Sequence, residues 1–123
     1  VYATMRDTNG KNKAHKEALL DWAKSHQANL RVVELDVTQD KSVETAKAFI
    51  LSETNGRMDV IINNAGIYGS GIQEAFTISD YKTLFEVNVF GTVRVNNAFL
   101  PTLRKQGNGL IIQISSLLGR IVI

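Results

Sequence analysis

The chain has 123 residues, of which 44% are hydrophobic and 21% charged, and its net charge is +2. These values are typical of one soluble globular domain and argue against disorder. The small positive charge, without a basic stripe carrying aromatic residues, predicts no nucleic-acid partner. No apolar run is long enough for a membrane span, and no His or carboxylate spacing indicates a metal site. The absence of cysteine excludes disulfides and favours a reducing, cytoplasmic location.

Hydrophobic periodicity predicts alternating strands and helices along the first half of the chain. Strands are expected over residues 1–5 and 30–35, and helices over residues 13–27 and 41–53. Asp40 stands where it could cap the second helix.

The second half continues the alternation with longer elements. A strand is predicted over 58–62, and its continuous apolar run suits a parallel strand that is covered on both faces. A long helix is expected over 79–105, with Thr77 and Asp80 forming a capping box at its start. Pro101 should loosen its last turn. A final strand is expected over 110–115.

Alternating strands and helices with short connections indicate the α/β class, with a doubly wound parallel sheet. We expect residues 1–123 to form one domain. The chain starts in an apparent strand and stops in an apolar stretch, so we expect it to be a partial chain. In this fold class, ligands bind outside the carboxyl ends of the strands. The residues that follow each predicted strand are therefore the candidate site.

The first two strands end in residues suited to a dinucleotide. Arg6 could bind a 2′-phosphate on an adenosine ribose, whereas a carboxylate there would bind the free hydroxyls of NAD. The alternative for Arg6 is a solvated charge. Asp36 could accept the amino hydrogens of adenine, with Val37 against the ring edge, or it could simply begin the next helix.

The third predicted strand ends in Asn63-Asn64-Ala65-Gly66, which is the most specific motif of the chain. Two successive amides can tie neighbouring strand ends together. The small Ala65 and Gly66 leave room for a ligand ribose close to the backbone. A loop that only reversed the chain would not need these four residues in this order.

The segment Asp59-Val60-Ile61-Ile62-Asn63-Asn64-Ala65-Gly66 resembles the sheet motif of the short-chain dehydrogenase/reductase family. Other segments follow the family's order, and together they cover nearly the whole chain. These are Val1 to Asp7 in its NADP-preferring form, Leu35-Asp36-Val37, Val87-Asn88-Val89-Phe90-Gly91, and Ile114-Ser115-Ser116-Leu117-Leu118-Gly119. The resemblance implies an incomplete Rossmann-type domain, which lacks the family's first strand and its C-terminal elements.

The resemblance also implies catalytic roles. Ser116, three residues before Gly119, would hydrogen-bond the substrate oxygen, and Ser115 would be structural. Asn88 would hold a water in a proton relay. Asn88 stands among apolar residues, and we expect its amide to be buried and to need partners. From the residues alone, the favoured alternative is a structural amide whose partners are backbone groups. The family's glycine-rich phosphate loop and its Tyr-x-x-x-Lys motif do not occur in this sequence.

The implied function is hydride transfer between NADP(H) and a carbonyl or alcohol substrate, with NAD a weaker candidate on account of Arg6. One alternative is a family member without catalysis that binds NADP as a regulatory or signalling protein. Another is a methyltransferase that uses Asp36. The apolar residues of the 79–105 helix lie on more than one face, which favours a homodimer or homotetramer through this helix.

The family's sheet order implies one further consequence for the fold. The family's first strand lies between the strands that correspond to residues 1–5 and 58–62. Without that strand, the chain should form two halves with unpaired inner edges.

Overall fold

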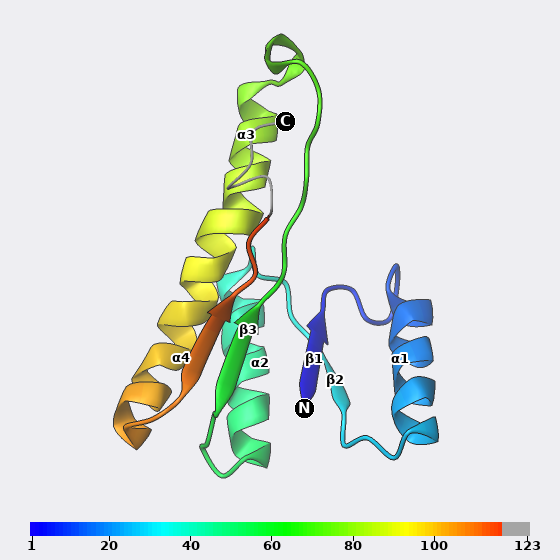
Figure 1. Cartoon of the computed structure of the whole chain (residues 1–123), viewed down its shortest axis with the longest axis vertical. Coiled ribbons are helices and arrows are strands. Elements are labelled where there is room, and N and C mark those ends of the chain that lie inside the picture. Colours follow the sequence, from blue (N-terminus) through cyan, green and yellow to red (C-terminus); the bar gives the residue numbers. More distant parts are fainter. Residues whose placement is uncertain (117–123) are drawn as a thin grey trace.

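The computed structural model describes residues 1–116, and Leu117, Leu118 and Gly119 of the serine motif lie outside them. Two pairs of parallel strands form the sheet region. Strand β1 (Tyr2–Met5) pairs with β2 (Arg31–Glu34), and β3 (Val60–Asn63) pairs with β4 (Leu110–Gln113). Figure 1 shows β1, β3 and β4 pointing toward the same end of the molecule. The predicted alternation of strands and helices and the parallel pairing are confirmed.

In the described part of the chain, four α-helices connect and extend these strands: α1 (Lys13–Ser25), α2 (Asp40–Glu53), α3 (Ile78–Phe85) and α4 (Thr92–Gln106). A short 3₁₀ turn, Gln73–Ala75, precedes α3. Within residues 1–116, no helix combines the length and apolar composition needed to cross a bilayer.

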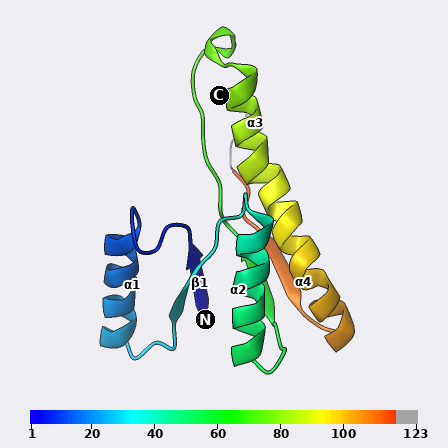
Figure 2. The same ribbon diagram turned by 180° about the vertical axis from the view of Figure 1, so that it is seen from behind.

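The core lies where α2 and α4 pack together against the strands (Figure 2). Val43 and Ala46 of α2 are each 1% exposed, and Phe99 of α4 is 3% exposed. Full burial of a side chain such as that of Val43 or Phe99 stabilises the fold by roughly 1.5–3 kcal/mol. The remaining core residues come from β2 and the residue after it, from β3, and from the same two helices: Val33, Leu35, Ile50, Ile61, Val95, Ala98 and Leu103.

The two strand pairs are not hydrogen-bonded to each other within the described residues. A cavity of about 900 Å³ separates them, with Tyr2, Ala3 and Thr4 of β1 on one side and Ile61 and Ile62 of β3 on the other. The predicted division into two halves with unpaired inner edges is confirmed. Packing of α2 against α4 joins the halves.

The helix predicted over 79–105 is not uniform. Its path is continuous (Figure 1), but Glu86–Gly91 forms a π-helical segment between α3 and α4. Such segments contain one inserted residue and often lie at functional sites. The predicted capping box of Thr77 and Asp80 is confirmed, with hydrogen bonds in both directions. The helix continues beyond Pro101 to Gln106, where Gly107 ends it in a left-handed conformation.

Asp40 does not cap α2. The capping position is Gln39, and Asp40 is the first helical residue, where its side chain pairs with Arg94 on α4. A carboxylate in the first turn still interacts favourably with the helix dipole. The local sequence could not reveal the competing arginine, which is 54 residues away.

Candidate active site

The turn after β1 presents Arg6 at the carboxyl end of the strand, with Arg6 exposed to solvent. Asp7 adopts a left-handed conformation (φ 50°), and its carboxylate accepts a hydrogen bond from the Lys11 N–H at 2.8 Å. The buried Thr8 hydroxyl donates to the Glu34 carboxylate at the end of β2, also at 2.8 Å. The Arg6 turn is therefore fixed to the neighbouring strand.

Asp36 begins a tight turn after β2. Its Oδ1 accepts hydrogen bonds from the Thr38 N–H at 2.9 Å and from the Thr38 hydroxyl at 2.7 Å. Partial burial raises the pKa of Asp36, but these hydrogen bonds and the charges of Arg6 and Arg94 outweigh it and hold the pKa below its usual value. The carboxylate is therefore ionised at neutral pH and can accept hydrogen bonds. Both the turn-forming and the adenine-binding interpretations fit this geometry.

The ends of β3 and β4 lie side by side, because the Ile114 N–H donates to the Asn63 carbonyl at 3.0 Å. The Asn63 side chain donates to Asn96 Oδ1 on α4 at 2.8 Å. It therefore ties a strand end to a helix, whereas we expected it to tie neighbouring strand ends. Ala65, Gly66 and Ser116 follow these strand ends and are exposed.

Asn88 lies in the middle of the π-helical segment, and its amide group binds the backbone of Ile67 in both directions. Asn88 Oδ1 accepts from the Ile67 N–H at 2.9 Å, and Asn88 Nδ2 donates to the Ile67 carbonyl at 2.9 Å. Asn88 is exposed, so the prediction of a buried amide was wrong. The prediction that this amide has hydrogen-bond partners is confirmed, and the partners are backbone groups of the loop that follows β3.

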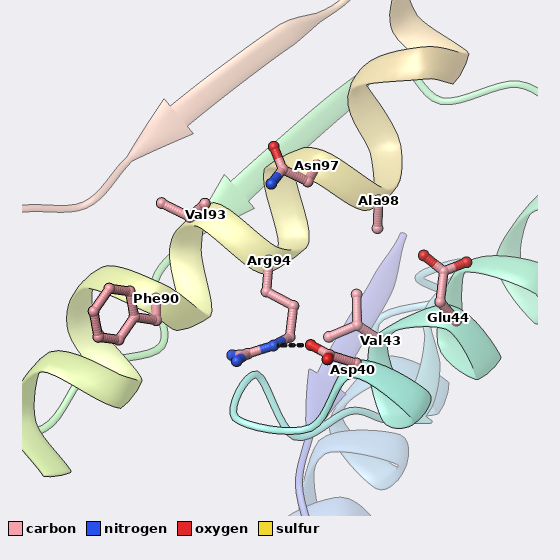
Figure 3. A pocket seen from close by; sticks show the side chains of 8 residues that line it. All are labelled: Asp40, Val43, Glu44, Phe90, Val93, Arg94, Asn97 and Ala98. Atoms are coloured by element: carbon pink, nitrogen blue, oxygen red, sulfur yellow. Dashed lines mark hydrogen bonds and ion pairs between the residues drawn. The ribbon is translucent and has the colours of Figure 1, made fainter. Parts of the chain in front are cut away.

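Arg94 of α4 binds three acceptors from separate segments. Its Nε pairs with the Asp40 carboxylate (Figure 3), one terminal nitrogen donates to the Val37 carbonyl at 2.5 Å, and the other to Glu86 Oε1 at 2.9 Å. Partial burial lowers the pKa of Arg94, but the bonds to Asp40 and Glu86 outweigh it and raise the pKa above its usual value. The guanidinium is permanently charged and suited to planar, multiple hydrogen bonding.

A second contact between the same segments comes from Gly91, the last residue of the π-helical segment. A β-carbon placed on Gly91 would lie 2.7 Å from Val37 Cγ2 and 3.0 Å from Val37 Cβ. Only glycine therefore permits the observed approach of Val37 to this helix. The turn after β2 packs directly against the segment that carries Asn88.

The structure thus brings the predicted residues to one edge of the molecule. Leu35 N–H donates to the Met5 carbonyl, so Arg6 and Asp36 follow adjacent strand ends. The ends of β3 and β4 form the second group. Helix α4 contacts both groups, through the bond of Arg94 to the Val37 carbonyl and the bond of Asn96 to the Asn63 side chain. The roles of the predicted residues stay predictions.

Sequence reasoning missed Arg94 and Asn96 at this edge. A signal for Arg94 existed, because it is a charged residue inside the largely apolar stretch 87–99. A charge in such a stretch needs partners if it is partly buried. Its partners could not be identified, because Val37 and Asp40 are distant in the sequence. Asn96 gave no comparable signal.

The donor set fits an adenine dinucleotide with a 2′-phosphate. An exposed guanidinium at the end of β1 and an ionised carboxylate at the end of β2 supply a cation for phosphate and an acceptor for adenine. Arg6 and Asp36 follow strand ends that lie side by side, because the Leu35 N–H donates to the Met5 carbonyl at 3.1 Å. Among residues 1–116, no group of three His, Asp or Glu side chains is placed to hold a metal ion.

Comparison with known proteins agrees with this geometry. The family model described as short chain dehydrogenase matches residues 8–122. Mouse 17-beta-hydroxysteroid dehydrogenase type 1 is 35% identical over 97% of this chain and 33% of its own length. Human retinol dehydrogenase 8 is 36% identical over 97% of this chain and 36% of its own length.

A solved structure shows the same fold. NADPH-bound carbonyl reductase from chicken fatty liver superposes with a TM-score of 0.82 at 30% identity, covering 97% of this chain and 49% of that one. The chain spans about a third of the length of the curated relatives named above. The doubly wound, Rossmann-type arrangement is therefore that of part of a larger family fold. The chain belongs to the short chain dehydrogenase family.

Proposed function

We propose that the whole protein is an NADP-dependent oxidoreductase that transfers hydride between NADP(H) and a carbonyl or alcohol substrate. One observation carries the choice of cofactor: the exposed Arg6 guanidinium at the end of β1, next to the ionised Asp36. A 2′-phosphate carries nearly two negative charges and favours an arginine at this point. The carbonyl reductase with bound NADPH supports the same choice.

When bound, the nicotinamide supplies or accepts the hydride, and the residues of this chain bind and orient the reactants. Arg6 holds the 2′-phosphate, Asp36 accepts from the adenine amino group, and Val37 packs against the ring. Ala65 and Gly66 allow a ribose to approach the backbone after β3.

The residues nearest the chemistry are Ser116 and Asn88. Ser116 donates a hydrogen bond to the substrate oxygen, an interaction that strengthens as this oxygen gains negative charge. Asn88 is fixed in orientation by its two bonds to Ile67. One amide hydrogen and one oxygen lone pair of Asn88 are chemically available beyond those bonds, which suits the ordering of a water.

The direct test is turnover by the purified whole protein. We expect NADPH to be oxidised in the presence of a carbonyl compound, and NADP to be reduced with an alcohol. The panel should include a 17β-hydroxysteroid and retinol, since two relatives are named for them. Binding of NADPH without turnover of any compound would favour the non-catalytic, regulatory alternative. Absence of both binding and turnover would contradict the proposal.

Replacing Arg6 with alanine should weaken binding of NADPH far more than binding of NADH. A charge-assisted hydrogen bond contributes about 1.5–3 kcal/mol, so the dissociation constant for NADPH should rise about 10- to 100-fold. The constant for NADH should change by less than about threefold, since it lacks the phosphate. Fluorescence titration of the two cofactors measures both. An equal loss of affinity for NADPH and for NADH would remove the argument that the cofactor is NADP.

We also propose that the protein forms a homodimer or homotetramer through the helix that runs from α3 to α4. The support is an exposed apolar face on this helix, on which Phe90 is 51% and Val93 is 48% exposed. Exposed apolar surface of this kind marks interaction sites. Sedimentation of the whole protein should show a dimer or tetramer, and replacing Phe90 with aspartate should shift it toward the monomer. A monomeric wild type would refute this.

A further inference from the structure

The three acceptors of Arg94 have distinct roles in the proposed site. The Val37 carbonyl belongs to the turn that would receive adenine, and Asp40 is the first residue of the helix after this turn. Glu86 is the first residue of the π-helical segment, two residues before Asn88. One guanidinium therefore contacts both the turn after β2 and the segment that carries Asn88. Figure 3 shows its third contact, the pair with Asp40 of α2.

The Arg94 side chain is 21% exposed, and both of its carboxylate partners are more exposed than it is. The Asp40 side chain is 86% exposed and the Glu86 side chain 40% exposed. Both carboxylates would be hydrated if Arg94 were removed, so these ion pairs contribute little net stability. The bond to the Val37 carbonyl is different, because it fixes a backbone position next to the predicted adenine pocket.

Gly91 supplies an independent observation that the same segments are fitted to each other. Val37 approaches Gly91 so closely that no other residue fits there without displacement. The absence of a β-carbon at Gly91 thus lets the turn pack closely against the π-helical segment, and Arg94 bonds to both.

Resting on the proposed function, we propose that Arg94 is a positioning residue that sets the cofactor turn at Asp36–Val37 and the Asn88 amide in one fixed arrangement. Cofactor binding and hydride transfer then depend on the same side chain. The planar fork is required, because a lysine offers one point charge and cannot bind three acceptors in this geometry.

The test compares Arg94→Met and Arg94→Lys with Arg104→Met, which alters an exposed arginine of the same helix. In the whole protein, both Arg94 variants should raise the dissociation constant for NADPH and lower kcat, each by about tenfold, as misplacement of reacting groups does. Arg104→Met should change neither by more than about twofold. Wild-type values in Arg94→Met, or full recovery in Arg94→Lys, would overturn the proposal.

A double variant separates positioning from a general loss of structure. If Arg94 acts on catalysis through Asn88, Arg94→Met should lower kcat no further in the Asn88→Ala protein, while still raising the constant for NADPH. If kcat of the double variant fell by the product of the two single-variant losses, Arg94 and Asn88 would act independently, which would contradict the proposal.

A third readout needs no activity at all. The Ile67 N–H is bonded to Asn88 Oδ1, so Arg94→Met should speed its hydrogen exchange by about tenfold and Arg104→Met should not. A wild type that binds no NADPH would defeat the proposed function, while the exchange of Ile67 would still decide the positioning role. Unchanged exchange at Ile67 would refute that role.

Discussion

Replacing Asn88 with alanine in the whole protein is expected to lower kcat by about 10²-fold or more, the range associated with proton-transfer groups. The variant loses the amide that would order a water, and it also loses both bonds to Ile67. The affinity for NADPH should change little, because Asn88 does not contact the turn after β2. Steady-state kinetics and cofactor titration together measure this split between kcat and binding.

Asn97→Ala is the matched control, because Asn97 is an exposed asparagine of the adjoining helix α4. It should retain kcat within about twofold, as expected of a surface substitution. Unfolding by urea should show that Asn88→Ala remains folded, with a loss of about 1–3 kcal/mol for its two hydrogen bonds. A folded Asn88→Ala protein with wild-type kcat would exclude Asn88 from the chemistry.

Replacing Gly91 with alanine is expected to destabilise the whole protein by about 1–3 kcal/mol, because the new β-carbon overlaps Val37. Helix propensity alone predicts the opposite sign, since alanine is favoured over glycine inside a helix by about 1 kcal/mol. The valine side chain is short and β-branched, and its own Cβ is involved, so rotation about χ1 cannot relieve the contact. The free energy of unfolding in urea distinguishes the two expectations.

The Val37→Ala change provides the control for this contact. It removes Cγ2, the nearest atom to the new β-carbon, so the double variant should recover part of the lost stability. A coupling energy of about 0.5–3 kcal/mol is expected for residues in direct contact. A Gly91→Ala protein as stable as the wild type would show that Val37 and Gly91 are not tightly packed.

Local patterns predicted the elements and the edge where the site lies. The capping box at Thr77 and the apolar run before Asn63 are short-range signals, and the structure contains both elements. The strand ends could also be placed together, because parallel strands bring their carboxyl ends to one edge. The alternation of strands and helices indicated the fold class, and the family resemblance at Asn63 to Gly66 then implied the order of the strands.

The details that failed all depend on contacts between distant segments. Asp40 was predicted to cap a helix, but its side chain forms an ion pair with Arg94 instead. Asn88 was predicted to be buried, but a helix pattern does not show which side of the helix another segment covers. The π-helical segment was missed because its period of about 4.4 residues per turn differs too little from 3.6 to be seen over six residues.

The π-helical segment also determines where this helix tolerates a change in length. Six residues at about 4.4 per turn rotate the chain by about 490°, and five residues of regular α-helix rotate it by about 500°. Deleting one residue between Glu86 and Gly91 would therefore restore regular winding and leave α3 and α4 in nearly the same rotation. A deletion within α4 would instead rotate the preceding part of the helix by about 100°. Gaps among relatives are therefore expected within Glu86–Gly91 rather than in the regular parts of this helix.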